Sequence, residues 1–449
     1  MSENSADSHK ATFSLTTLKK ILAEAGCTRF FFKNLAENDN SKNQIYLGMS
    51  FEVLNIFPNI NIYPVSDLKE PIFKAGLSFS WVDENGNDFS APESKLILYP
   101  HYPEVRFSGF LKGCKGAPSD LLNRRLEGRV LFLGIKADGN ILGYVAPAGS
   151  NILNALKSET IISQVTVFNE ISLGSKSDTL DSRQILFREL RRIYNKKWID
   201  SKRLKSDGTI GPCPNMNCGG FTLEAELGIK PNSYSEPDFF GWEVKQHAVR
   251  DFKRFSSGAI TLMTPEPDGG EYKDLGIIHF IKTYGYLDKT GRANRMNFGG
   301  VHKVGYTHPL TNLELKLLGY AEKKGIENPN GCVALVNSKD KIAASWSFAG
   351  MMAHWNRKHN KSVYVPSMIN ASPHQYCYSN IVKTGEGTDF LKFLKAFSAG
   401  NVYYDPGIKC ENFAGSSPTT KRRSQFRIKF NDLGNLYNNG IKVVDVLKE

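Results

Sequence analysis

The chain has 449 residues, of which 41% are hydrophobic and 23% are charged. This length and composition exclude a disordered chain and predict two or three folded domains. The formal net charge of +12 favours a polyanionic partner, and the seven scattered cysteines do not predict a disulfide framework.

The chain begins with polar residues. Residues 1–12 lack the apolar core of a signal peptide, and we expect them to form a flexible tail. No stretch of the sequence approaches the roughly 18 uninterrupted apolar residues of a transmembrane helix. We therefore expect an intracellular protein.

Apolar residues recur at helical spacing in residues 14–25, which predicts a helix that ends at Gly26. Short apolar runs separated by turn residues follow at 29–32, 45–48, 77–81, 95–99, 129–135 and 141–145. Such runs predict a small β-barrel, and we place this first domain at residues 13–156. Within it, residues 33–44 are rich in hydrogen-bonding side chains. They form either a long hairpin loop or a binding arm, and the residues alone favour the loop.

Residues 157–182, which include the polar run SLGSKSD, predict a linker to a second domain at 183–449. Residues 183–198 show helical spacing of apolar side chains. The basic residues on the rest of this helix form either a solvated face or a phosphate-contacting surface: Arg188, Arg191, Arg192, Lys196 and Lys197. Cys213 and Cys218 lack a matching second pair of ligands, so we do not expect a zinc site.

The pattern richest in chemistry is Asp238-x4-Glu243-x-Lys245. Because side chains on a strand alternate between its faces, Glu243 and Lys245 point one way and the apolar residues between and beside them point the other. Gly241 allows a bend that brings Asp238 back beside Glu243. The pattern therefore predicts two carboxylates and an ammonium group at one point, or else a solvated pair on a surface strand.

A further carboxylate, Glu224, lies upstream on a short helix predicted at residues 219–228, which has glycine at both ends. Carboxylate oxygens at this spacing suit Mg²⁺, which also takes phosphate oxygens. These carboxylates and the lysine are the groups needed for metal-assisted hydrolysis of a phosphodiester. If the strand continues, His247 lies on the same face as Lys245. There it has either a catalytic role, in which it orients a water or acts as a general acid or base, or a purely structural role.

Later stretches of the chain have simpler interpretations. Residues 277–281 and 332–336 predict strands of the same sheet as the motif, and residues 388–397 predict an amphipathic helix. Residues 355–361 are either a solvated helix end or a groove contact. In residues 421–429, alternation predicts a strand that presents donors on one face: Gln425, Arg427 and Lys429.

Residues 183–449 resemble the MvaI/BcnI family of restriction endonucleases. The resemblance rests on GGFTLEAELGI, EPDFFGWEVKQH and the stretches at 261–267, 297–300, 344–348, 354–359 and 403–407. It implies a monomeric PD-(D/E)XK nuclease that uses Mg²⁺ and binds double-stranded DNA. The implied catalytic residues are Glu224, Asp238, Glu243 and Lys245, with Asp238, Glu243 and Glu224 as metal ligands. His247 joins the catalytic candidates because of its position on the strand. By chain position, the residues that read DNA are Asp405, Lys409, Arg423, Gln425 and Arg427.

The stretch FFKNLAENDNSKNQIYLG resembles the EcoRII-type N-terminal effector domain, a DNA-binding pseudobarrel that grips the major groove with two arms. The first arm would span residues 33–44 and the second would lie around 104–112. The residues expected at bases are Lys33, Asn38, Asn43 and Arg106, and those expected at phosphates are Lys42, Lys112 and Lys115.

We expect an α+β multidomain protein, with an N-terminal DNA-binding β-pseudobarrel and a C-terminal α/β nuclease domain. The resemblances imply a type II, IIE-like restriction endonuclease of the bacterial cytoplasm. It would cut at CCWGG, or alternatively CCSGG, and its N-terminal domain would bind a second copy of the site. A cognate DNA methyltransferase is expected without a stable complex, and no membrane partner is expected. The alternatives are a mismatch-repair nickase and a non-catalytic DNA-binding regulator.

Overall fold

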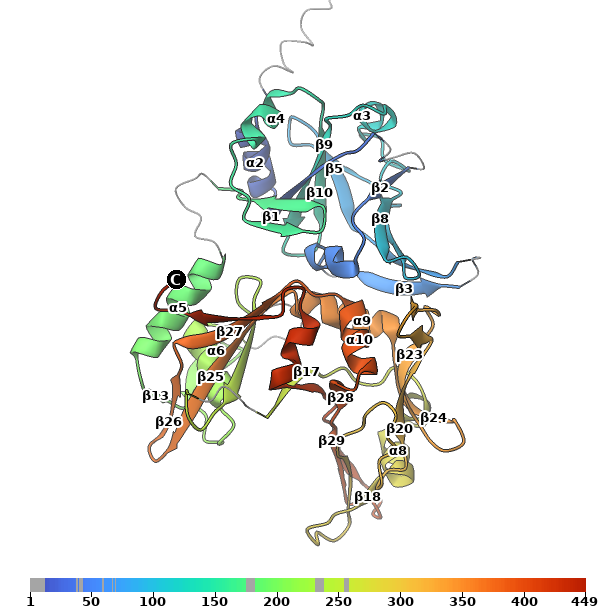
Figure 1. Ribbon diagram of the computed structural model, residues 1–449, viewed down its shortest axis with the longest axis vertical. Helices are drawn as coiled ribbons and strands as arrows, with labels where there is room; N and C mark the ends of the chain where they lie inside the picture. Colours follow the sequence, from blue (N-terminus) through green and yellow to red (C-terminus); the bar gives the residue numbers. More distant parts are fainter. Residues whose placement is uncertain are drawn as a thin grey trace, which may run out of the picture. The chain divides into compact units, whose positions relative to one another are not determined.

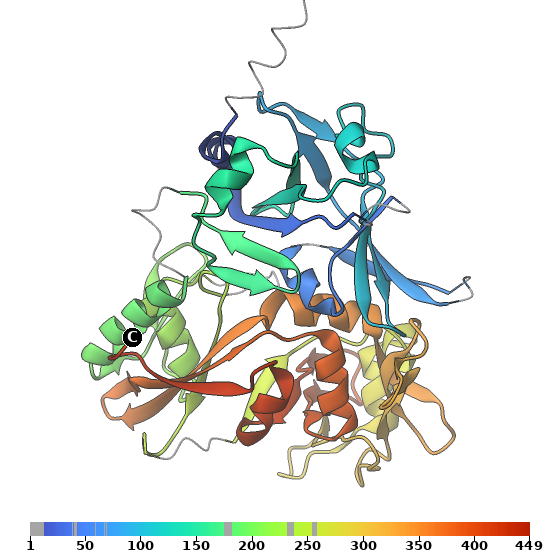
Figure 2. The same cartoon turned by 45° about the horizontal axis from the view of Figure 1, so that its top comes forward.

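The computed structural model describes residues 13–37, 39, 43–58, 60–66, 68, 70–174, 182–230, 238–253 and 258–449. The predicted tail at 1–12 and the predicted DNA contacts Asn38 and Lys42 lie outside these residues. The chain divides into two compact units, Met1–Asp181 and Ser182–Glu449, which are coloured along the sequence in Figures 1 and 2.

The described part of the first unit contains short helices and strands. They are α2 (Leu15–Glu24), β1 (Cys27–Asn34), β2 (Gln44–Tyr46), η1 (Phe51–Ile56), β3 (Asn61–Val65), β4 (Ile72–Gly76), β5 (Phe79–Val82), β6 (Asp88–Ser90), β7 (Lys95–Tyr99), β8 (Glu104–Ser108), α3 (Ser119–Asn123), β9 (Val130–Lys136), β10 (Ile141–Ala146), α4 (Asn151–Leu156), β11 (Ser163–Val165) and β12 (Phe168–Ile171). One sheet has the order β11-β12-β1-β9-β10-β5-β6, and the other has the order β2-β8-β7-β4-β3.

The packing of strand β1 on both of its faces explains why its sequence is almost continuously apolar. Phe30 and Phe32 belong to the core cluster that contains helix α2, and Phe30 stacks on Phe132 of β9 with ring centroids 5.5 Å apart. Phe31 points to the opposite face, where it meets Phe168 at 6.4 Å. Because both faces of β1 are covered, successive residues are buried and the alternation of a half-exposed strand is absent.

The first unit extends beyond the expected boundary at residue 156. Strands β11 and β12 form a hairpin that pairs with β1, with Ile171 opposite Phe30. The expected linker at 157–182 therefore starts too early, since Val165, Phe168 and Ile171 are buried. These apolar residues are spread among polar ones and do not form a run that the sequence would show. The second expected arm also differs, because β8 covers much of it and lies between β2 and β7.

The second unit contains the following elements in its described residues. They are α5 (Ser182–Asn195), β13 (Ile199–Asp200), β14 (Lys202–Leu204), β15 (Ile210–Pro212), α6 (Gly219–Leu227), β16 (Glu243–Ala248), β17 (Ala259–Met263), α7 (Glu271–Asp274), α8 (Gly276–Tyr284), β18 (Tyr286–Leu287), β19 (Arg295–Gly299), β20 (Glu314–Leu318), β21 (Tyr320–Ala321), β22 (Gly325–Ile326), β23 (Cys332–Val336), β24 (Ile342–Ser347), α9 (Phe348–Lys358), β25 (Lys361–Ala371), β26 (His374–Tyr378), β27 (Ile381–Glu386), α10 (Phe390–Ser398), β28 (Val402–Tyr404), β29 (Gly407–Glu411), β30 (Thr419–Lys421), β31 (Phe426–Lys429), η2 (Phe430–Leu436) and β32 (Ile441–Asp445).

The main sheet of this unit has the order β13-β26-β25-β27-β32, and β16 pairs with β25 in parallel. Smaller sheets surround it, among them β17-β31-β28, β20-β23-β24 and β18-β19-β29-β30. Helices α5 and α6 pack near one end of the main sheet (Figure 1). The C-terminus lies beside α5, where Arg191 donates to the backbone oxygens of Val446 at 2.9 Å and Glu449 at 2.5 Å.

Two predicted strands behave differently from expectation. Residues 277–281 lie inside helix α8, so the predicted strand is wrong. The prediction failed because a short apolar run is compatible with both a buried strand and the buried face of a helix. Residues 332–336 do form strand β23, but β23 pairs with β20 and β24 and not with the strand of the motif. The predicted helix at 388–397 is confirmed as α10, whose N-cap Asp389 accepts from the Lys392 backbone at 2.9 Å.

The cysteines also correct an expectation. Cys213 and Cys218 form a disulfide bond, although the scattered cysteines did not predict one. The bond joins the chain after β15 to the N-cap of α6. None of the helices in the described residues is long and apolar enough to cross a membrane.

Candidate active site

The motif residues lie at the start of β16, which pairs with β25 of the main sheet. Glu243 stands opposite Ser362 of β25, and Lys245 stands opposite Tyr364. Val244 faces the apolar cluster beneath α5, together with Trp242 just before the strand. The predicted alternation therefore holds, and the Glu243 side chain is buried at 1% exposure although it carries a charge.

A tight turn connects Asp238 to this strand. Phe239 and Trp242 exchange two backbone hydrogen bonds of 2.9 Å, and Gly241 between them has a φ of +83°. This reversal returns the chain, so that Asp238 Oδ2 accepts from the Val244 backbone N–H at 2.9 Å. The bend predicted at Gly241 does bring Asp238 back to the start of the strand that carries Glu243.

Two lysines approach the Glu243 carboxylate. Lys245 Nζ lies 2.5 Å from Glu243 Oε1, and Lys358 Nζ lies 4.0 Å from the same oxygen. Lys358 ends helix α9, which is anchored by Trp355, a fully buried residue that packs on Phe393 at 4.6 Å. Sequence reasoning missed this role of Lys358, because residues 355–361 carried no signal beyond their basic charge.

The pKa values of the three carboxylates at this site are shifted by burial and by the neighbouring charges. Burial and Asp238 raise the pKa of Glu224 to about 7. Burial and Glu243 raise the pKa of Asp238 to about 6. Burial opposes ionisation of Glu243 as well, but Lys245 and Lys358 outweigh it and lower the pKa of Glu243. The charges of these three carboxylates and of the two lysine ammonium groups therefore interact with one another.

This site fits a hard divalent cation. Glu243 Oε2 is buried and has no hydrogen-bond partner in the described structure, and all three acidic groups supply oxygen donors. No group of three or more His, Cys, Asp and Glu side chains among the described residues could hold a metal ion by itself. Mg²⁺ commonly binds through one or two carboxylates together with waters and phosphate oxygens. Asp238 and Glu243 are the pair that such binding would use.

Asp238→Asn is expected to stabilise the protein at pH 8 by about 2 kcal/mol, because the amide removes an ionisation that the fold disfavours. Since the folded-state pKa of Asp238 lies above the ordinary value of 3.8, wild-type stability should fall as the pH rises from 3.8 through about 6. Thermal unfolding between pH 4 and pH 8 measures the difference, which should be small at pH 4 and largest at pH 8.

Asp445→Asn is the matched control for this series. Hydrogen bonds from Asn380 and from the Leu447 backbone lower the pKa of Asp445, so this variant should lose stability at pH 8. An Asp238→Asn variant that is less stable than wild type at pH 8 would contradict the electrostatic account.

His247 occupies the face predicted for it but has a different environment. Strand β16 continues to Ala248, so alternation places His247 on the face of Glu243 and Lys245. Its ring is buried and packs on the ring of Phe430, with centroids 4.4 Å apart. Burial and Lys383 lower the pKa of His247 to about 4, so the ring is neutral at pH 7. This environment favours the structural interpretation over an acid that donates protons at neutral pH.

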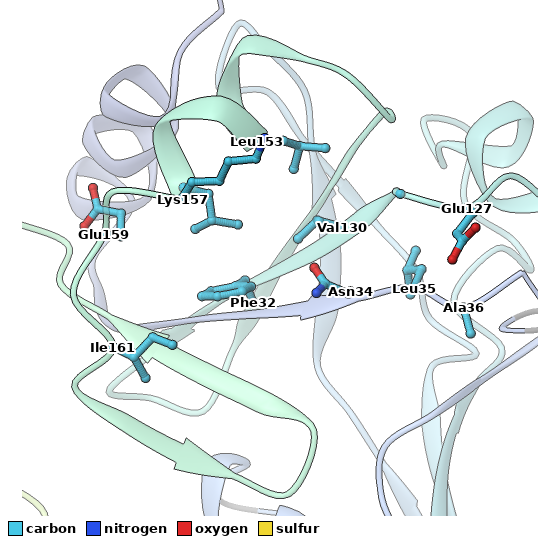
Figure 3. Close-up of a pocket in the computed structure, with 12 residues that line it drawn as sticks. Phe32, Asn34, Leu35, Ala36, Glu127, Val130, Leu153, Lys157, Glu159 and Ile161 are labelled. Carbon is cyan, nitrogen blue, oxygen red and sulfur yellow. The ribbon is translucent and has the colours of Figure 1, made fainter.

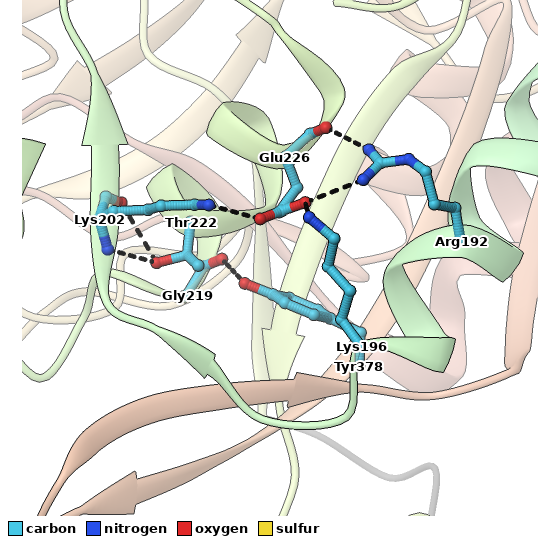
Figure 4. A network of polar contacts seen from close by, with 7 residues as sticks. All are labelled: Arg192, Lys196, Lys202, Gly219, Thr222, Glu226 and Tyr378. Atoms are coloured by element: carbon cyan, nitrogen blue, oxygen red, sulfur yellow. Dashed lines mark hydrogen bonds and ion pairs between the residues drawn. The ribbon is translucent and has the colours of Figure 1, made fainter. Parts of the chain in front are cut away.

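Helix α6 carries both Glu224 and Glu226. Figure 4 shows the polar contacts through which Glu226 holds this helix. The Glu226 carboxylate meets Arg192 of α5 at 3.2 Å, Lys196 at 2.8 Å and Lys202 of β14 at 2.5 Å. Although burial opposes ionisation, Lys196 and Lys202 lower the pKa of Glu226 to about 2. Arg192 and Lys196 therefore support the fold, which favours a structural role over a phosphate-contacting one.

The backbone of α6 is held as well. Thr222 Oγ1 bonds to both the N–H and the oxygen of Lys202, at 3.1 and 3.2 Å. Tyr378 of β26 donates to the Gly219 oxygen at 2.7 Å (Figure 4). Gly219 packs on Gln246 of β16, where an added Cβ would lie 3.0 Å from the amide. These contacts fix the distance between α6 and the strand that carries Glu243.

The C-terminal residues expected to read DNA are partly brought together. Phe426 and Ile428 are buried, and Arg427 on the other face of β31 donates to Asp405 at 2.6 Å. The Asp405 backbone N–H donates to the backbone oxygen of Gln425 at 2.8 Å. Arg423 is exposed beside Gly407, the first residue of β29, and Lys409 is exposed farther along the same strand. The predicted strand at 421–429 is shorter than expected and begins at Phe426.

The candidates in the first unit are more scattered. Lys33 is wrong as a base contact in this structure, since it is buried at 5% exposure in an ion pair with Asp39. Asp39 also accepts from the backbones of Ala36 and Tyr46, both at 3.0 Å, so the pair closes the loop after β1. The other described candidates are wholly or partly exposed: Asn43, Arg106, Lys112 and Lys115. Arg106 pairs with Glu104 at 2.6 Å and bonds to Gln44 at 3.0 Å.

The first unit also has an open pocket of about 910 Å³ that the sequence did not indicate (Figure 3). Phe32 and Val130 from the sheet and Leu153 and Leu156 from α4 supply apolar walls. Lys157 and Glu159 lie at the same opening, and Glu159 pairs with Lys19 at 2.9 Å.

Comparisons with known proteins bear on the second unit. The sequence profile of the MvaI/BcnI restriction endonuclease family matches residues 187–437, more than half of the chain. The solved structure of restriction endonuclease MvaI with cognate DNA is 17% identical and covers 59% of this chain and 99% of its own, with a TM-score of 0.44. MvaI without DNA is 15% identical and covers 60% and 99%, with a TM-score of 0.33. No curated protein matches the chain significantly.

The family profile spans α6, the Asp238 turn, β16 and α9, so the matched residues contain the whole acidic and basic cluster described above. The resemblance predicted from the sequence is confirmed. The chain belongs to the MvaI/BcnI restriction endonuclease family, a family of sequence-specific DNA endonucleases.

Proposed function

We propose that the chain is a type II restriction endonuclease that hydrolyses double-stranded DNA at the cluster of Asp238, Glu243 and Lys245. The observation that carries the proposal is the meeting of a buried, partly unpaired carboxylate with two ammonium groups beside a second carboxylate. A purely structural ion pair would not leave Glu243 Oε2 without a partner at this depth. The restriction endonuclease family of the chain supports DNA as the substrate.

In this mechanism, Asp238 and Glu243 would hold Mg²⁺, which when bound would supply charge neutralisation at the phosphate and a water of lowered pKa. Glu224 would add an oxygen donor from helix α6. Lys245 remains charged, because Glu243 outweighs the effect of burial and raises the pKa of the lysine. Its ammonium group stabilises the negative charge that develops on the phosphate oxygens. Water oxygen bonds to phosphorus, the bond to the 3′-oxygen breaks, and the products are a 3′-hydroxyl and a 5′-phosphate.

Target recognition is assigned to both units. In the second unit, Asp405, Gln425 and Arg427 with the exposed Arg423 and Lys409 would contact the site at which the DNA is cut. In the first unit, the resemblance to EcoRII-type effector domains supports binding of a second copy of the site. Because Lys33 is buried, that binding would use Asn43, Arg106, Lys112 and Lys115 among the described residues. CCWGG is the first choice of target and CCSGG the alternative.

Plasmid cleavage tests the proposal. We expect the wild type to make double-strand cuts at one short sequence in Mg²⁺, and to make none when EDTA removes the metal. Sequencing of the ends gives the site and the cut position. Single-strand nicks alone would indicate a nickase instead, and specific binding without any cut would indicate a non-catalytic regulator.

A further inference from the structure

The turn between Asp238 and Glu243 holds an aromatic side chain that the fold does not need. Phe239 and Trp242 at the base of the turn are buried, at 9% and 1% exposure. Phe240 at its tip is 62% exposed. Its ring meets Phe239 edge-on at 4.8 Å, which orients the ring but leaves most of it uncovered.

The backbone of Phe240 is also in an unfavourable conformation. Its φ is +45°, and that of Gly241 is +83°, so both central residues of this two-residue turn lie in the left-handed region. A turn with positive φ at both positions is the one that favours Asn, Asp or Gly, since a side chain with a bulky Cβ substituent is strained there. Of the seven other non-glycine residues at positive φ in the described chain, four are Asn and one is Asp. Folding alone would place Asn or Gly at this position.

The position of the ring indicates what it contacts. Phe240 lies two residues after Asp238 and three before Glu243, the two carboxylates that would hold the metal. DNA bound with its phosphate at these carboxylates would therefore lie close to the turn. An apolar ring there can pack on deoxyribose and base surfaces without reading sequence. Strain retained at a site of chemistry is a sign of function.

We propose that Phe240 is a substrate-positioning residue, whose strained and exposed ring packs on the DNA nucleotide next to the phosphodiester that is cut. This inference rests on the proposed function and adds to it a contact that holds the scissile phosphate at Asp238 and Glu243. The strain of the turn is relieved by any residue that tolerates a positive φ, so stability and activity should respond in opposite directions.

The test compares full-length wild type with Phe240→Asn and Phe240→Gly. We expect both variants to unfold at a higher temperature than wild type and to cut saturating plasmid DNA at least tenfold more slowly in Mg²⁺. Phe240→Leu keeps an apolar side chain and the strain, and should retain more activity than Phe240→Asn. Leu275→Asn is the control for removal of an exposed apolar side chain, because Leu275 is 55% exposed with an ordinary φ of −109°, and it should cut at the wild-type rate.

Each outcome decides something. Wild-type cleavage by Phe240→Asn would overturn the inference alone, whereas a wild type that cuts no DNA would overturn the proposed function and this inference together. A lower unfolding temperature for both turn variants, with a matching loss of cleavage, would make the ring structural. Sedimentation that shows a wild-type dimer dissolved by Phe240→Asn, with cleavage unchanged, would assign the ring to a protein interface and overturn the inference.

Discussion

Lys245→Ala is expected to lower the rate of DNA cleavage by about a thousandfold or more, the cost of removing a charged group aimed at the transition state. Lys245 is the closest cation to Glu243, at 2.5 Å, and its removal leaves a carboxylate of 1% exposure with Lys358 at 4.0 Å as its nearest cation. Single-turnover cleavage of plasmid DNA in Mg²⁺ measures the loss.

Graded and neutral controls accompany this variant. Lys358→Ala should cost about tenfold, because its ammonium group lies farther from the carboxylate and is partly exposed. Lys339→Ala changes an exposed lysine elsewhere on the same unit and should have no effect. Cleavage by Lys245→Ala at the wild-type rate would show that the reaction does not use this cluster, even if the wild type is a nuclease.

Glu226→Gln is expected to destabilise the second unit by about 2–3 kcal/mol, since it leaves three cations around a site that has lost its charge. This loss of stability is smaller than for a fully buried ion pair, because the side chains of Arg192, Lys196 and Lys202 are 41%, 46% and 25% exposed. Thermal unfolding should show a drop of about 5–10 °C at pH 7. Cleavage should also fall, because α6 loses the contact that holds Glu224 toward β16.

The pH dependence of this effect has a definite sign. The folded-state pKa of Glu226 is lowered to about 2 from 4.5, so its stabilisation is complete above pH 4.5 and is lost as the pH falls toward 2. Wild type and Glu226→Gln should therefore approach each other in stability near pH 2. Glu189→Gln is the matched control, since Glu189 also accepts from Arg192, at 2.7 Å, but is more exposed than Glu226 and should cost little. Equal destabilisation by the two variants would contradict the central role of Glu226.

Much of the nuclease unit could be read from local patterns. The alternation of charged and apolar residues around Glu243, the bend at Gly241 and the glycine-bounded helix of Glu224 each depend on residues close together in the chain. These patterns also carried the resemblance to the MvaI/BcnI family, which the family profile confirms. They were reliable because strand and helix periodicities decide which side chains share a face before any tertiary contact forms.

Contacts between distant segments could not be predicted in the same way. Lys358 reaches Glu243 because α9 precedes β25 and β25 pairs with β16, a register that no local pattern contains. Lys33 looked like a free basic residue, and its burial depends on Asp39 and on the closure of the following loop. The helix at 277–281 and the disulfide between Cys213 and Cys218 likewise depended on which elements pack together.

The sequence by itself therefore determined the chemical groups, their order and their faces: two carboxylates and a lysine at one turn and strand, with a third carboxylate on a short helix. Only the tertiary structure decided the electrostatic state of those groups. Burial beside Glu243 raises the pKa of Asp238 to about 6, while two lysines keep Glu243 ionised. The physical reason is that desolvation and charge interactions depend on distances in space, which the order of residues along the chain does not specify.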